Sequence, residues 1–122
     1  MIRLFRRTPT LSNWTPEDDK LVTLAKGARS RVQAESGAAL RDETGRTYAS
    51  AQVSVGHLVL SAVEVVVAQA VASGSTGIEA IVLCAGSGFS PSDIALVKEF
   101  AGTGVPLHHV TDAGDITDSY LT

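Results

Sequence analysis

The stretch Glu79–Asp93, with the sequence EAIVLCAGSGFSPSD, decides the fold class of this chain. Within Glu79–Ala85, every residue after the glutamate is apolar, and the segment has the length of a buried strand of the parallel type. Gly86–Phe89 follows as a flexible loop. Ser90 as the cap, a proline at the first helical position and Asp93 at the third then predict the start of a helix. A buried strand that leads directly into a helix indicates an α/β protein.

The apolar stretch before this unit, Leu58–Ser73, is predicted to form one long helix. Its run Val65–Val67 would suit a strand, but the stretch as a whole is too long for one, and Gly74 follows where a helix C-cap belongs. Glu64 and Gln69 are its only long polar side chains. A helix so apolar must be buried on most of its surface. We therefore expect a sheet on one side of Leu58–Ser73 and a partner subunit on the other.

The N-terminal half supplies a further helix and a hairpin. Thr15, followed by a proline and two acids, is typical of a helix start, and apolar residues recur at helical spacing as far as Val32. Residues 36–55 are predicted to form a hairpin that turns near Gly45.

After the second helix, Pro106–Val110 is predicted to form a short strand, followed by a polar tail. The whole predicts a three-layer α-β-α fold with a mixed sheet of four to five strands, in the order α-β-β-α-β-α-β. We expect residues 1–14 to be a flexible arm and residues 15–122 to be a single domain.

Composition narrows the functional classes. The chain has 122 residues, of which 44% are hydrophobic and 5% aromatic, and its net charge is −3. This mild negative charge argues against nucleic-acid binding, and no apolar run reaches the length of a membrane span. The single cysteine excludes an intramolecular disulfide and a multi-cysteine zinc site. We expect a cytoplasmic protein without membrane attachment.

Four short segments, taken in their order, resemble the small homotetrameric cytidine deaminases. They are Gly37–Leu40 (GAAL), Gly45–Tyr48 (GRTY), Glu79–Val82 (EAIV) and Asp93–Phe100 (DIALVKEF). The resemblance covers roughly residues 18–115. It implies the three-layer fold predicted above and a homotetramer, although a dimer would also cover the apolar helix.

Enzymes of that family hold zinc with three protein ligands, and a glutamate that is not a ligand moves the proton. The first ligand and the glutamate belong to the motif C-A-E at the start of the long helix. When Gly74 sets the register, the motif falls on Ser61–Val63; an ungapped count from Tyr48 places it on Val63–Val65. Neither register supplies a cysteine, a histidine or the glutamate. In the first, Ser61 is the degenerate ligand position and Val63 the degenerate glutamate position.

The two remaining ligands of the family lie in the motif P-C-x-x-C. Here they correspond to Ser90 and Asp93. Serine is a very poor neutral ligand, and one aspartate does not hold a catalytic zinc. We therefore expect no zinc, no other cofactor and no catalytic residue of the family type.

The substrate site implied by the resemblance is also altered. The base-stacking phenylalanine corresponds to Ala34, and the ribose-binding N-V-E corresponds to Ser50–Gln52 or to Gln52–Ser54. A residual pocket is predicted around His57, Gly86, Gly88 and Ser90. Its loop, Ala85–Ser90, has glycines and N–H groups that suit a phosphate or carboxylate, but we expect no lysine or arginine near it.

These observations predict a catalytically inactive cytidine deaminase homologue that acts as an oligomeric binding or scaffold protein. Self-association is expected through Leu58–Ser73, as a dimer or tetramer, and a protein partner could also bind the arm that carries Arg3–Arg7. The alternative is a hydrolase, similar to nucleoside deaminases, with a rearranged metal site that uses residues such as His57 and Asp93. The other candidate ligands are Cys84, His108, His109, Asp112 and Asp115.

Overall fold

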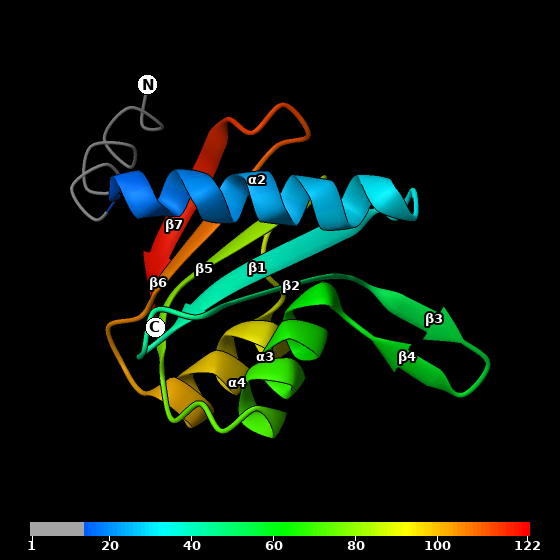
Figure 1. Ribbon diagram of the computed structural model, residues 1–122. Coiled ribbons are helices and arrows are strands. Elements are labelled where there is room, and N and C mark those ends of the chain that lie inside the picture. The colour runs from blue at the N-terminus through cyan, green and yellow to red at the C-terminus, as the bar shows by residue number, and fades with distance from the viewer. Residues whose placement is uncertain (1–13) are drawn as a thin grey trace.

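The computed structural model describes residues 14–122, so the predicted arm lies almost wholly outside the described residues. Its helices and strands follow one another along the chain in the order shown by the colours of Figure 1. They are α2 (Pro16–Arg31), β1 (Ser36–Asp42), β2 (Thr47–Ala51), β3 (Val53–Val55), β4 (Leu58–Leu60), α3 (Ala62–Ala72), β5 (Ile78–Ala85), α4 (Pro91–Ala101), β6 (Pro106–Val110) and β7 (Ile116–Leu121).

The main sheet has five strands in the order β2-β1-β5-β6-β7. Strands β5 and β6 are parallel, and every other neighbouring pair in this sheet is antiparallel. Helix α2 covers one face, whereas α3 and α4 lie side by side on the other (Figure 1). The three-layer α-β-α fold with a mixed sheet is therefore confirmed.

Each face of the sheet has its own hydrophobic core. The core under α3 and α4 includes Leu40, Ile81, Leu83 and Leu107 from the sheet. The core under α2 is smaller and is built mainly from alanine, valine and leucine side chains, with Cys84 among them. Side chains of β5 alternate between the two cores, so the apolar run of this strand is buried on both faces, as predicted.

Helix α2 packs closely on β1 at Gly37, which has no side chain. A Cβ atom at this position would stand 2.3 Å from the carbonyl oxygen of Ala25 and 2.8 Å from Cβ of Arg29. Any larger residue would push the helix away from the sheet. Gly37 therefore sets the distance between these two layers.

A buried ionic cluster joins the start of α2 to the sheet. Asp18 is almost fully buried; its carboxylate accepts hydrogen bonds from the Thr15 backbone at 3.0 Å and from Arg41 at 2.9 Å. Arg41 also pairs with Glu79. His108 is completely buried beside this group, with Nε2 3.7 Å from Asp18.

The predicted long helix is wrong at its start. Leu58–Leu60 is strand β4, which pairs with β3 in a small second sheet, and the helix begins only at Ala62. Ser61 marks the boundary, because its hydroxyl accepts a hydrogen bond from the Glu64 N–H while the Glu64 carboxylate accepts one from the Ser61 N–H. The predicted end is confirmed: the helix stops at Ala72, just before Gly74, whose φ is +95°.

The predicted polar tail is also wrong, since Ile116–Leu121 forms the edge strand β7 beside β6. Its residues are only half-buried or exposed, so the alternation of apolar residues that identifies strands is weak here. The predicted hairpin is present, but its returning strand is interrupted at Gln52 into β2 and β3. None of the helices within residues 14–122 is long and apolar enough to cross a membrane.

Candidate functional site

The starts of α3 and α4 meet at a hydrogen bond between Ser61 and Asp93. The Ser61 hydroxyl donates to the Asp93 carboxylate at 2.8 Å, and it accepts from the Glu64 N–H at 3.0 Å. Ser90 caps α4, because its hydroxyl accepts from the Asp93 N–H at 3.1 Å. The structure thus brings together the three positions at which the resemblance implies zinc ligands, Ser61, Ser90 and Asp93.

These side chains do not fit a zinc ion. Zinc sites in proteins use thiolate, imidazole or carboxylate ligands, and here two of the three positions carry neutral hydroxyl groups. Both hydroxyls already cap helices, and Asp93 is buried with Ser61 as its donor. Within the described residues, no group of three or more histidine, cysteine, aspartate or glutamate side chains could hold a metal ion.

The position of the family glutamate offers no proton carrier. Val63 is completely buried in the core under α3 and α4. The adjacent Glu64 is used in the capping box of α3, where its carboxylate accepts from the Ser61 backbone at 2.7 Å. No free carboxylate therefore stands at the start of α3.

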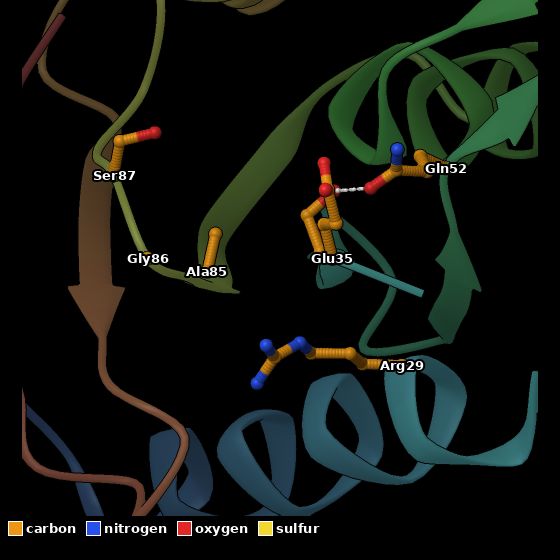
Figure 2. Close-up of a pocket in the computed structure, with 7 residues that line it drawn as sticks. Arg29, Glu35, Gln52, Ala85, Gly86 and Ser87 are labelled. Carbon is orange, nitrogen blue, oxygen red and sulfur yellow. Dashed lines mark hydrogen bonds between the residues drawn. The ribbon is translucent and has the colours of Figure 1, made fainter. Parts of the chain in front are cut away.

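A hollow that includes several polar side chains lies beside the loop that follows β5. It has a volume of about 430 Å³ and is drawn in Figure 2. Its lining comes from α2, from the chain on either side of β1 and β2, and from the end of β5: Arg29, Glu35, Ser36, Gln52, Ala85, Gly86 and Ser87. Inside it, the Ser36 hydroxyl donates to the Gln52 side-chain oxygen at 2.7 Å.

The residual pocket that we predicted is only partly assembled around this hollow. Gly86 lines it, as does Gln52 from the segment compared with N-V-E. His57, by contrast, lies exposed at the turn between β3 and β4, outside the residues that line the hollow. Gly88 packs tightly instead: a Cβ there would stand 3.1 Å from the Tyr120 hydroxyl and 3.5 Å from Nδ1 of His109.

Arg29 is a residue of this hollow that the sequence does not predict. We expected no basic side chain near the loop Ala85–Ser90, and this expectation is wrong, because Arg29 and Gly86 line the same hollow. The Arg29 guanidinium donates through Nε to the Ala34 carbonyl at 3.1 Å and forms an ion pair with Asp112. Only the close packing of α2 on Gly37 brings this side chain to the end of β5, and no local pattern signals that contact.

The two histidines and the cysteine of the sheet are buried and make structural contacts. Because a carbonyl oxygen can only accept, Nε2 of His109 donates to the Ala85 carbonyl at 2.8 Å. Burial lowers the pKa of His108, although the nearby Asp18 carboxylate acts in the opposite direction. Burial likewise raises the pKa of the Cys84 thiol, against the effect of Arg29. A neutral, buried thiol is a poor nucleophile and a poor metal ligand.

Comparisons with known proteins agree with the fold. A family model described as cytidine deaminase-like matches residues 14–114. Among solved structures, the crystal structure of cytidine deaminase from Mycobacterium leprae is similar, with a TM-score of 0.62 and 20% sequence identity. The likeness covers 84% of this chain and 91% of that chain. A search of curated proteins gives no match.

Proposed function

The chain belongs to the cytidine deaminase-like family, and we propose that it is a member without deaminase activity that serves as an oligomeric binding or scaffold protein. The observation that carries the first half is the hydrogen bond between Ser61 and Asp93, at 2.8 Å. It stands where the resemblance implies two zinc ligands, on the first turns of α3 and α4. The proposal includes that no zinc binds there.

The chemistry of deamination supports this view. In this family a zinc-bound water attacks the base, and a carboxylate carries the proton between water and product. Here the ligand positions hold two hydroxyls and one carboxylate, which already satisfy each other and the helix ends. Val63 supplies no proton carrier. Both the activation of water and the transfer of the proton therefore lack their groups.

Activity measurements test the proposal directly. The full chain is incubated with cytidine and with deoxycytidine, with and without added zinc, and released ammonia is measured. We expect no turnover above the buffer control in any condition. Turnover that disappears in the variant Asp93→Asn would overturn the proposal and would return Asp93 to the reaction.

The oligomeric half rests on an exposed apolar surface that has no cover within residues 14–122. The exposed apolar residues lie on the β3–β4 hairpin, which projects from the body of the domain in Figure 1, and on α3. Its large exposed side chains are Val55 (71% exposed), Leu58 (54%), Val59 (66%) and Val71 (50%). A two-stranded hairpin is at best marginally stable alone, so a second copy of the chain is the cover that we propose. The self-association predicted through Leu58–Ser73 is thus proposed for β4 and α3 together.

A further inference from the structure

The hollow of Figure 2 carries opposite charges on two of its sides. We propose that it binds a small zwitterionic α-amino acid, with the carboxylate toward Arg29 and the loop at Gly86 and Ser87, and the ammonium group toward Glu35. This inference names a ligand class for the binding role proposed above and rests on it. It does not depend on the zinc or oligomer measurements, so its failure can be told apart from theirs.

Hydrogen-bond donors for a carboxylate gather on one side of the hollow. A guanidinium has five N–H groups, and Arg29 commits Nε to the Ala34 carbonyl and part of Nη1 to Asp112. The backbone N–H of Ser87 lies in the loop beyond Ala85, the last residue of β5 that is paired with β1. A planar carboxylate suits such a set, because a guanidinium can bind both of its oxygens.

The ion pair between Arg29 and Asp112 is weak enough for a ligand carboxylate to compete with it. The Asp112 side chain is 70% exposed, so its attraction to Arg29 is screened by water. Asp112 lines a second hollow, which shares Ala85 and Gly86 with the first, and it is not among the residues that line the proposed site. A ligand carboxylate competes with Asp112 for the guanidinium, and removal of the Asp112 charge should therefore tighten binding.

Glu35 decides between a zwitterion and a simple anion. Its carboxylate is exposed on the rim of the hollow and has no ion pair in the part of the chain that the structure describes. A phosphate or a plain carboxylate would be repelled by Glu35 and by Asp112. An ammonium group on the same ligand turns the first of these repulsions into an attraction.

The remaining side of the hollow suits the rest of such a molecule. The Ser36 hydroxyl holds the Gln52 side-chain oxygen at 2.7 Å, which leaves the Gln52 amide nitrogen as a donor. In Figure 2 the Ser87 hydroxyl is directed toward the side on which Gln52 and Glu35 lie. The volume of about 430 Å³ is within the range of small-molecule sites.

Calorimetric titration of the full chain tests the inference. The probes are the standard L-amino acids one at a time, the acids that match the best binders but lack the amino group, inorganic phosphate, and cytidine. We expect at least one amino acid to bind with a Kd of about 1 mM or below, and its deaminated counterpart to bind about tenfold more weakly. The absence of binding by every amino acid would overturn the inference, as would tighter binding of phosphate or cytidine.

Three variants test the inference, because each should change amino-acid binding in a stated direction. Glu35→Gln should weaken amino-acid binding about tenfold, and Arg29→Lys should weaken it by a similar factor because the planar fork is lost. Asp112→Asn should strengthen it several-fold. Thermal unfolding of each variant shows whether the fold is intact. If Glu35→Gln strengthens or does not change binding in a folded protein, the ammonium contact is refuted.

Discussion

The hydroxyl of Ser61 donates to the carboxylate of Asp93 at 2.8 Å and so links the first turns of two helices that are far apart in sequence. In a zinc-dependent deaminase the same places would be occupied by ligands of the metal. In this chain a hydrogen bond joins the two positions, and its energetic role in the fold can be measured.

Ser61→Ala should destabilise the protein. The change removes the cap of α3 and leaves the buried Asp93 carboxylate without its side-chain donor, so we expect a loss of about 1–3 kcal/mol in the free energy of unfolding. Urea denaturation followed by circular dichroism measures it. Ser92→Ala is the matched control, because Ser92 is exposed and its hydroxyl lies 3.3 Å from the Ser90 hydroxyl, its one side-chain hydrogen bond within residues 14–122. Equal effects of the two variants would refute a structural role for the Ser61–Asp93 bond.

Gly37→Ala should be more damaging than its size suggests. The new Cβ would stand 2.3 Å from the Ala25 carbonyl oxygen, so α2 must shift from β1, at a cost of about 3 kcal/mol or more. Gly27→Ala is the control of opposite sign. It lies inside α2 with nothing nearer than 4.0 Å to its Cβ, and should stabilise the protein by roughly 0.5–1 kcal/mol. A tolerated Gly37→Ala would contradict the close packing of these layers.

His108 should make the protein less stable in mild acid. Burial lowers the pKa of His108 in the folded protein below its unfolded value of about 6.5, so the unfolded chain binds more protons as the pH falls. The stability from neutral His108 is present above about pH 6.5 and is lost progressively below it. Asp18 and Arg41, the charged groups beside it, and Ser119, which hydrogen-bonds its Nδ1 at 2.6 Å, remain unchanged in the variant.

Unfolding free energies of the wild type and of His108→Gln, measured from neutral pH down to about pH 5, test this dependence. The wild type should lose more stability over that range than the variant. Parallel curves for the two proteins would show that His108 does not titrate differently on folding.

Charged substitutions among the exposed apolar residues of the β3–β4 hairpin and α3 should weaken the proposed self-association. We expect the wild type to have a mass above the 12.7 kDa of one chain in size-exclusion chromatography with light scattering. Val59→Lys and Val71→Lys should each shift it toward the monomer, because a lysine cannot be buried cheaply in an apolar interface. Val32→Lys serves as control, since Val32 is 63% exposed at the end of α2. A monomeric wild type, or an equal shift by the control, would contradict the proposed interface.

Local sequence signals predict the elements that have a long apolar run or clear capping and terminating residues. The run Glu79–Ala85 and the cap at Ser90 marked β5 and α4, and Gly74 marked the end of α3. The sequence predicts Leu58–Leu60 as part of the helix, because a short apolar strand that adjoins an apolar helix has the same composition as the helix. Strand β7 was missed because its half-buried residues lack a regular apolar alternation.

The site shows the same division between local and tertiary information. The resemblance to two local motifs predicts Ser61, Ser90 and Asp93 as a set, and the structure places these residues together. Arg29 and Glu35 were not named, since their place at the hollow depends on how α2 crosses β1 at Gly37. A contact set by the packing of layers leaves no periodic signal in the sequence.

Zinc binding tests the central claim most directly. The full chain, purified without chelator and equilibrated with zinc, is analysed for metal per subunit beside the variant Ser61→Cys/Ser90→Cys/Asp93→Cys. We expect negligible zinc in the wild type and about one ion per subunit in the variant, whose thiolates would stand at the starts of α3 and α4. About one zinc per wild-type subunit, lost in Asp93→Asn, would contradict the account.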